Sequence, residues 1–497
     1  MGDKRIHFER RVGRIGFMGK GGRMPARRSG SDAPHAIMLR IGDERVSTST
    51  GDLEAARHEF IPMPDNLAGV FSRVPEAVVR PETGQDAADA VKICLEEHTR
   101  VVPRGAATSG LGGAVPVRGG VVIDLGKLCR VADIDRAGGT ATVEAGARWS
   151  DVMEALAREG YAPPCYPTSA WAATVGGWIS SGGYGAGTLT RGNFHRQIVS
   201  LEVGLPSGFL VKATGQEGRY SIPSFAGTEG QVGIITRATF PVVKFPEKSE
   251  TFAVLLKDLA EGIDLLEDIS RLEARPHSVE LVSSGAAGLY GRGWEEPVLI
   301  VTGEGAAAEV EGLARRLKDV LAGRGLDIQT HGNAGEIRAA RFSRIVEGKE
   351  ARPYMSAGLL MSPGGMRRFI LYLIERSAND PGLLFECGGV DRDRYLVTFG
   401  YRAPREHLSP LRAFARVRGI VAAGAGMGGV PYGVGLWNSP YIDVVLGKRK
   451  KELRRVKGEV DRLRIMNPGK FFSMTTRSGF RVPGWALRVY FGFAGRS

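Results

Sequence analysis

Hydrophobic positions recur with helical spacing in several segments of this chain. Residues 86–98 place Ala87, Val91, Cys94 and Leu95 on one face of a helix. The same pattern predicts helices at 149–160, 306–321 and 448–457, and short apolar runs predict strands at 121–125, 140–145, 198–208, 233–243 and 298–303. The mixture indicates an α+β protein.

The order of these elements divides the chain into four parts. Residues 1–60 lack sustained periodicity, which predicts an extended basic arm. In 61–245 the strands cluster around two glycine-rich stretches. The pattern changes near residue 246, and strand–helix alternation over 246–440 predicts a second domain with one sheet covered by helices. Residues 441–497 form a separate segment with a basic helix and an apolar-aromatic end.

Composition narrows the class of protein. The chain has 497 residues, enough for two or three domains. No apolar run approaches the ~18 residues of a membrane span, and the first thirty residues lack the apolar core of a secretory signal. The four cysteines form no CxxC pair, so we expect neither an iron–sulfur cluster nor a zinc site. The expected location is the cytoplasm.

The net charge of +13 comes from 67 basic and 54 acidic residues spread along the chain, so we do not expect a nucleic-acid partner. Positive charge is concentrated at 4–28 and 448–457. Each segment is interpreted either as a solvated surface or as a docking site for an acidic protein or a membrane.

Residues 103–114, "PRGAATSGLGGA", have a composition suited to binding phosphate. Glycine leaves backbone N–H groups open to phosphate oxygens and allows positive φ. The spacing differs from a P-loop, which needs a lysine, and from a Rossmann fingerprint, which opens a helix rather than preceding a strand. An ordinary structural turn is the alternative.

Two later segments repeat this composition. Residues 167–193 are rich in glycine and hydroxyl side chains, and "FAGTEGQVGIITRATF" follows at 225–240. Three such segments in chain order favour a binding site for a phosphorylated, partly flat ligand.

The order of these motifs resembles the FAD-binding domain of the vanillyl-alcohol-oxidase-type (PCMH-type) flavoproteins, and most of all the flavin subunits of bacterial glycolate oxidases and D-lactate dehydrogenases. The C-terminal "RIMNPGKFF" at 464–472 resembles the segment that closes the flavin site of that family. The resemblance implies a PCMH-type FAD-binding domain of two subdomains and an α+β cap with an antiparallel sheet covered by helices.

The resemblance also implies which residues contact FAD. They are Pro103, Arg104, Gly105, Ala106, Ala107, Thr108, Ser109, Gly110, Leu111, Pro167, Thr168, Ser169, Thr174, Val175, Gly176, Gly177, Ser180, Ser181, Glu229, Gly230, Gly233, Ile234, Ile235, Asn467 and Lys470. Some relatives attach FAD through a histidine of the first segment. This chain has none there, so a noncovalent flavin is expected.

The substrate end departs from the family pattern. Relatives that oxidise 2-hydroxyacids carry cap histidines that bind a metal or the substrate carboxylate. Here 386–401 and 428–441 contain no histidine, so no metal is expected. The candidates for catalysis are Tyr432, Asn438 and His195. Tyr441 lies in the same segment, where tyrosine and asparagine can hydrogen-bond a substrate and Trp437 can wall the site; Arg341 and Arg344 are candidate carboxylate ligands. Packed aromatics, a hydrogen-bonded histidine and surface ion pairs are the alternatives.

The resemblance implies an FAD-dependent dehydrogenase that oxidises a small hydroxyl-bearing, carboxylated substrate. Electrons would pass to a separate iron–sulfur or flavin protein, because this chain lacks cluster-forming cysteines, and such a partner could place the chain at the inner face of a membrane. Two alternatives stay open. One is an electron-transfer subunit with a degenerate substrate site. The other is a non-redox enzyme similar to the alkylglycerone-phosphate synthases, suggested by Gly176-Gly177-Trp178.

Overall fold

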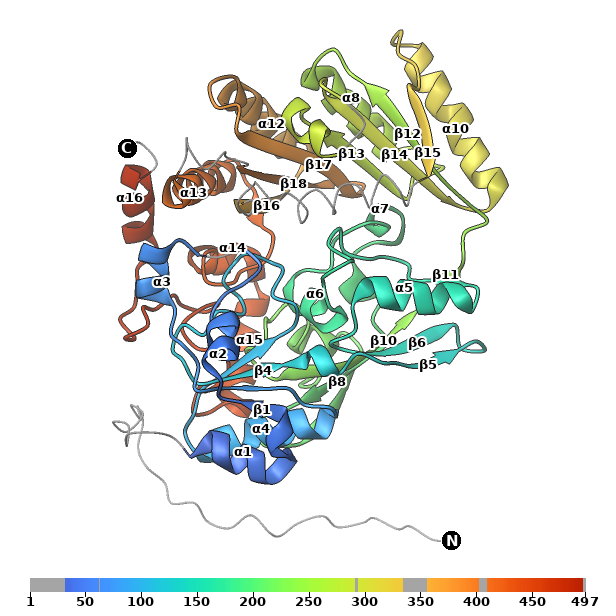
Figure 1. Cartoon of the computed structure of the whole chain (residues 1–497). Helices are drawn as coiled ribbons and strands as arrows, with labels where there is room; N and C mark the ends of the chain where they lie inside the picture. The colour runs from blue at the N-terminus through green and yellow to red at the C-terminus, as the bar shows by residue number, and fades with distance from the viewer. Residues whose placement is uncertain (1–31, 62, 291–293, 334–354, 402–408, 495–497) are drawn as a thin grey trace.

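The computed structural model describes residues 32–61, 63–290, 294–333, 355–401 and 409–494 (Figure 1). A first domain, in the lower half of Figure 1, contains sheets of four and five strands and a two-stranded sheet. A cap with one large sheet lies above it, and the C-terminal segment returns to the first domain. The predicted α+β architecture is confirmed.

The first sheet has the strand order β1-β2-β4-β3, and its central pairings are parallel. Its strands are β1 (Val46–Ser47), β2 (Ala77–Val79), β3 (Val101–Arg104) and β4 (Val121–Asp124). Helix α4 (Gly84–Glu96) begins with a capping box in which Thr83 and Asp86 bond each other's backbone N–H groups. This helix buries the apolar face that its periodicity predicts.

The second sheet is antiparallel, with the order β5-β6-β10-β8-β9. Its strands are β5 (Val131–Asp135), β6 (Thr140–Glu144), β8 (Ser200–Gly204), β9 (Leu210–Thr214) and β10 (Ile234–Pro241), and β7 (Tyr161–Ala162) pairs separately with β11 (Val243–Lys244). Helices α5 (Trp149–Arg158) and α6 (Val175–Ser181) pack here through an aromatic cluster, in which the Trp149 ring lies 5.1 Å from Trp178 and 5.4 Å from Phe194. The cluster fixes α6 beside the glycine-rich segments.

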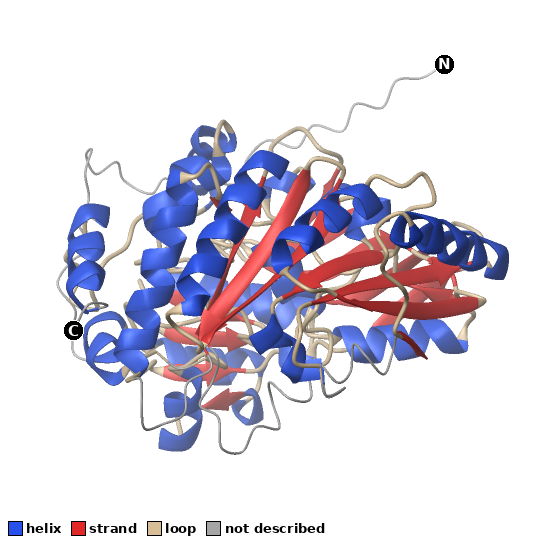
Figure 2. Ribbon diagram, turned by 90° about the horizontal axis from the view of Figure 1, so that it is seen from above, coloured by secondary structure: helices blue, strands red, loops and turns tan. Residues whose placement is uncertain are grey.

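The cap sheet is antiparallel, with the order β15-β12-β14-β13-β17-β18-β16-β19. Its strands are β12 (Lys248–Leu255), β13 (Ser278–Val282), β14 (Val298–Gly305), β15 (Thr330–Asn333), β16 (Met355–Met361), β17 (Leu383–Asp391), β18 (Arg394–Tyr401) and β19 (Val430–Pro431). The helices α8 (Leu259–Ser270), α10 (Ala307–Ala322), α12 (Pro363–Ala378) and α13 (Pro410–Gly426) belong to this domain. Figure 2 shows helices lying over the strands, and in Figure 1 the opposite face of the sheet is turned toward the first domain.

The predicted N-terminal arm is wrong from residue 32 onward. The helices α1 (Ala33–Ile41) and α2 (Thr50–Ala56) are folded, and β1 pairs with β2. Helix α3 (Asp65–Phe71) follows, just inside the predicted FAD-binding domain. Helix α1 buries Ala33 and Ile37 against α4. Helices of seven to nine residues are too short to give sustained periodicity in the sequence. The basic residues at 4–28 lie outside the described residues.

The C-terminal segment returns to β3 and then continues to the cap. Val101 donates to Ile465 O at 2.9 Å and accepts from the backbone N–H of Asn467 at 2.7 Å. The helices of this segment are α14 (Ile442–Leu446), α15 (Arg449–Val460) and α16 (Gly484–Ala494). Two further short helices lie earlier in the chain, α7 (Thr188–Arg191) and α9 (Ser284–Ala287). None of the described helices has the length and hydropathy of a membrane span.

Helix α15 is only partly the exposed basic face that the sequence predicts. The Arg449 guanidinium donates to Pro223 O at 2.7 Å and Ala226 O at 3.1 Å. Lys457 donates to Gln231 O at 2.7 Å and Met466 O at 3.0 Å. These two cations fasten the helix to the first domain because they satisfy carbonyl groups there.

Candidate functional site

The first glycine-rich segment follows β3. Ala107, Gly110 and Gly112 have positive φ angles of 53°, 66° and 78°, so the backbone turns back repeatedly over a short length. Within the described part of the chain, the backbone N–H groups of 106–110 donate to no protein acceptor. Clustered free N–H groups of this kind are the donors that phosphate oxygens need.

The first and second glycine-rich segments touch at Gly105. A Cβ atom there would stand 2.4 Å from Thr174 Oγ1. The Thr174 hydroxyl caps α6 by accepting from the Gly177 N–H at 3.2 Å. The contact requires glycine, and it brings the two backbones to the same cavity.

A cavity of about 450 Å³ lies between these segments and the cap. Its volume falls in the range typical of cofactor and ligand sites. The predicted cofactor residues that line it are 103–109, Leu111, 167–169, Thr174, Gly176, Gly177, Ser180, Ser181, Glu229, Gly230, and 233–235. Gly110, Val175, Asn467 and Lys470 are not among its described lining residues. The structure therefore brings all three glycine-rich segments to one cavity.

Glu229, in the third segment, joins it to the chain that returns from the cap. Its carboxylate accepts hydrogen bonds from the backbone N–H groups of Val434 at 2.8 Å and Gly435 at 2.7 Å. Burial raises the pKa of Glu229 to about 7. With both oxygens bonded to these groups, the carboxylate holds the returning chain at the rim of the cavity.

Asn467 and Lys470 support the glycine-rich segments from behind. Asn467 Nδ2 donates to Glu229 O at 2.7 Å and to Gly113 O at 3.2 Å. Lys470 Nζ donates to Val115 O. Burial lowers the pKa of Lys470 to about 7, against the opposing effect of two carboxylates, Glu59 and Glu229. The sequence predicts contact with the cofactor for both residues. In the structure they hold the loops that line the cavity, and contact with the cofactor stays a prediction.

Glu59 is a site residue that the sequence analysis missed. It is buried, and its carboxylate accepts from the backbone N–H groups of Gly112 at 2.8 Å and Ala114 at 2.7 Å. It also lines the cavity. A single glutamate in a segment without periodicity gives no signal of this role in the sequence.

The cap contributes a polar wall, which the sequence analysis also missed. Ser278 and Glu280 on β13, Glu386 on β17, Thr398 on β18 and Ser356 on β16 line the cavity. Glu386 pairs with Thr398 and Glu280 with Gly388 in the strand registers, so their side chains share one face of the sheet. Side chains alternate between the two faces of these strands, and Leu281, Phe385 and Val397 on the opposite face are buried in the cap core.

The three candidates for catalysis lie in different surroundings. Tyr432 lines the cavity, where its hydroxyl accepts from the Tyr184 N–H at 3.1 Å and donates to Tyr184 O at 3.0 Å. Burial raises its pKa to about 12, so it stays protonated. Asn438 bonds Gly433 O at 2.9 Å and is not among the described lining residues, nor is His195. Arg341 and Arg344 lie outside the described residues.

A second, smaller cavity of about 20 Å³ adjoins the first, and both are lined by Ile61, Leu111 and Ser356. Arg418 lines it and is buried. Its Nη1 donates to Asn438 Oδ1 at 2.9 Å, while its Nε and Nη2 have no partner among the described residues. This volume holds one small molecule such as water.

The lining fits a flavin dinucleotide. The first segment supplies free N–H donors for phosphates, and the second supplies flat, small-residue surface. No histidine occurs among the described lining residues. In the described part of the chain, no three histidine, cysteine or acidic side chains lie close enough together to bind a metal ion.

Comparison with known proteins gives the same cofactor. The FAD binding domain family matches residues 75–214. The glycolate oxidase subunit GlcD of Bacillus subtilis is 25% identical over 438 residues, which cover 82% of this chain and 91% of the relative. A D-lactate dehydrogenase of Anaerostipes hadrus is 27% identical over 223 residues, covering 44% of this chain and 47% of the relative.

Two solved structures share the fold. An alkyldihydroxyacetonephosphate synthase superposes with a TM-score of 0.71 at 16% identity, covering 89% of this chain and 86% of the other. The 4-ethylphenol oxidase from Gulosibacter chungangensis, solved with isoeugenol, also gives 0.71 at 17% identity, covering 92% and 98%. The predicted resemblance, PCMH-type fold and FAD cofactor are confirmed, and the chain is an FAD-linked oxidoreductase.

Proposed function

We propose that this protein is a dehydrogenase that oxidises a small hydroxyl-bearing substrate in the 450 Å³ cavity and passes the electrons to a separate protein. The observation that carries the proposal is that polar residues of the cap sheet and the three glycine-rich segments line the same cavity. FAD, when bound, supplies the acceptor for the hydride of the carbon–hydroxyl group.

The chain's own residues would bind and orient both molecules. Residues 104–109 would hold the phosphates, and α6 would support the flat ring system. Glu280 and Glu386 would accept hydrogen bonds from substrate hydroxyl groups, and one of them would take the proton that the hydroxyl loses. Tyr432 would serve as a wall, since its hydroxyl is already bonded in both directions to Tyr184.

A 2-hydroxycarboxylate is the substrate class that the resemblance implies, and it needs a cation for its carboxylate. Arg104 is the one cation among the described lining residues, and its Nη1 donates to His58 O at 2.8 Å. The described wall therefore supports a substrate hydroxyl more strongly than a substrate carboxylate. For a carboxylate, we propose Arg418 as the candidate cation, with one carboxylate oxygen in the water-sized space of the adjoining cavity.

The electron acceptor is proposed to be an iron–sulfur or flavin protein, and the chain would reach the inner face of a membrane through that partner. The relative in Bacillus subtilis is named as a subunit, which supports assembly with other chains. The four cysteines of this chain are free, and Cys94, Cys165 and Cys387 are buried apart from one another.

Anaerobic visible spectroscopy of the purified holo-protein tests the proposal. D- and L-2-hydroxyacids, simple alcohols and polyols are added one at a time, and bleaching of the flavin absorbance is expected with at least one class. Dithionite provides the control for a reducible flavin. A flavin that dithionite bleaches and no hydroxyl compound bleaches would contradict the proposal and favour an electron-transfer subunit. A flavin that stays oxidised while a substrate is consumed would favour the non-redox alternative.

A further inference from the structure

Helix α16 is apolar on two opposite faces. Leu487 and Phe491 are buried against α13, where the ring of Phe491 lies 5.3 Å from that of Phe414. Trp485 and Val489 project from the other side, because at ~100° per residue they lie roughly half a turn away from the buried pair. They are 64% and 51% exposed. A helix at a protein surface in water ordinarily presents polar residues outward.

The turn before α16 adds another exposed aromatic side chain. Phe480 is 77% exposed and stands in a short hairpin, in which the Thr476 N–H donates to Phe480 O at 2.9 Å and the Val482 N–H donates to Met474 O at 3.0 Å. Trp485 lies five positions after Phe480, so their Cα atoms are at most ~18 Å apart. The two side chains can therefore meet the same surface.

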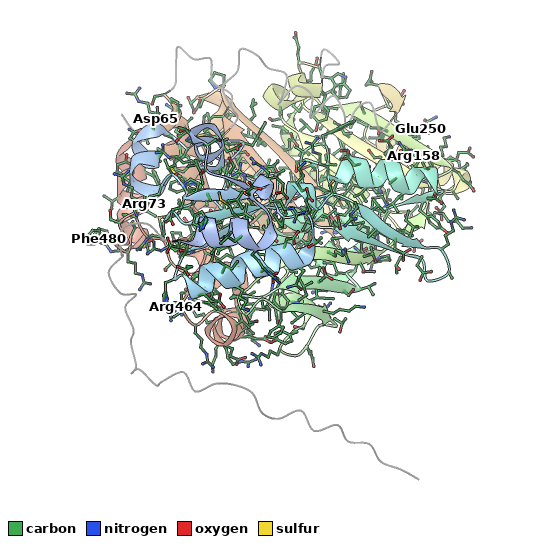
Figure 3. The ribbon with its side chains drawn as sticks, turned by 60° about the horizontal axis from the view of Figure 1, so that its bottom comes forward. Asp65, Arg73, Arg158, Glu250, Arg464 and Phe480 are labelled. Carbon is green, nitrogen blue, oxygen red and sulfur yellow. The ribbon has the colours of Figure 1, made fainter. Side chains whose placement is uncertain are left out.

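Positive charge lies beside these apolar side chains. No aspartate or glutamate follows Asp461 in the sequence, and arginines stand at 477, 481 and 488, within the segment that carries the apolar side chains. Arg477 and Arg481 are exposed on either side of Phe480. Arg73, also exposed, follows α3 on the same side of the molecule, with Asp65 at the start of that helix (Figure 3). The Arg477 N–H bonds Val70 O at 2.7 Å, which joins the turn to α3.

We propose that the turn at 477–481 and the outer face of α16, together the C-terminal patch, bind directly to the surface of a membrane that contains anionic lipids. Tryptophan and phenylalanine favour the boundary between lipid headgroups and acyl chains, and arginines beside them pair with lipid phosphates. The flavin site does not need this patch, so the inference goes beyond the proposed function. It adds a direct contact with the membrane to the association through a partner proposed above.

Sedimentation with vesicles tests the proposal. The holo-protein is mixed with vesicles of phosphatidylglycerol and phosphatidylcholine in equal parts, or of phosphatidylcholine alone. We expect sedimentation with the anionic vesicles at low salt. A Phe480→Ser/Trp485→Ser variant is expected to lose at least about tenfold in partition coefficient. An Arg477→Gln/Arg481→Gln variant is expected to bind more weakly and with less dependence on salt.

Matched controls separate the patch from general surface properties. Phe209 is 71% exposed on the first domain, and the Arg158 side chain is 71% exposed on α5. Phe209→Ser and Arg158→Gln are expected to sediment like the wild type, and the flavin content of every variant reports its folding. Wild-type protein that stays in solution with anionic vesicles would overturn the proposal. That result is the one expected if the patch binds a protein partner instead. Sedimentation of the aromatic double variant at the wild-type level would also overturn the proposal.

Discussion

The carboxylate of Glu59 accepts a hydrogen bond of 2.8 Å from the backbone N–H of Gly112, a residue of the first glycine-rich segment. The second oxygen of the same carboxylate accepts from Ala114 at 2.7 Å. A folded N-terminal segment thus supplies an internal anion to the far end of this loop. The near end, at residues 106–110, keeps its N–H groups for a ligand.

Glu59→Ala is expected to loosen the loop and weaken FAD binding. The substitution leaves two buried N–H groups without an acceptor, at a cost of about 2 to 4 kcal/mol in the free energy of unfolding. Urea denaturation and FAD retention through gel filtration measure the two effects. Glu54→Ala is the control, because Glu54 is exposed on α2 and pairs with Arg57 at the surface. Equal FAD retention in both variants would show that the loop does not depend on Glu59.

Gly112→Val is expected to abolish FAD retention. Gly112 has a φ of 78°, and a Cβ atom there would stand 2.7 Å from the Cβ of Leu436. A valine side chain therefore forces the loop away from the returning chain. Gly160→Val is the matched control, since Gly160 has a φ of 79° but no heavy atom within 4 Å of the added Cβ atom. Flavin content should fall only in the first variant, and loss in both would assign the effect to backbone strain alone.

His195 is expected to make the protein less stable in acid. Burial and the nearby Arg449 lower its pKa to about 4 from 6.5, so the folded state disfavours the protonated ring. The contribution of the neutral His195 ring to the free energy of unfolding is present above pH 6.5 and is lost as the pH falls toward 4. Over that range the unfolded state binds a proton that the folded state does not. The loss approaches ~3 kcal/mol. His195→Gln should flatten the stability profile between these pH values in urea denaturation, and an unchanged profile would assign the acid sensitivity to other groups.

Charge reversal on α15 should separate docking from folding. Lys448, Lys451 and Arg454 are exposed, whereas Arg449 bonds two carbonyl groups of the first domain. Changing the three exposed residues to glutamate should slow electron transfer to an acidic partner and weaken its salt dependence, while flavin reduction by substrate is unaffected. Arg449→Glu should instead reduce stability and flavin content. Stopped-flow measurement of both half-reactions decides, and unchanged partner reduction in the triple variant would exclude docking through α15.

The cofactor site could be predicted from the sequence because its chemistry depends on local composition. The segments at 103–114, 167–193 and 225–240 each carry their own glycine and hydroxyl signal, and the fold brings them to one cavity. The hydrogen bonds of Asn467 and Lys470 could not be predicted from the sequence, because their acceptors include carbonyl groups of loops 354 and 355 residues earlier in the chain.

The substrate end could not be predicted in the same way. Glu280 and Glu386 are more than a hundred residues apart in the chain, and they share one face of the sheet only because β13 pairs with β17 in one register. Shifting that register by one residue would move Glu386 to the opposite face. Sequence reasoning instead favoured Tyr432, which lines the cavity, and Asn438, which is not among its described lining residues.

The central claim is that FAD lies without a covalent bond in the cavity between the glycine-rich segments and the cap. The most direct measurement is the visible spectrum of the purified protein before and after acid precipitation, with the released flavin identified by chromatography. We predict a flavin spectrum close to one FAD per chain, all of it in the supernatant after precipitation. Yellow colour that stays with the precipitate, or a colourless protein that added FAD does not reconstitute, would contradict the account.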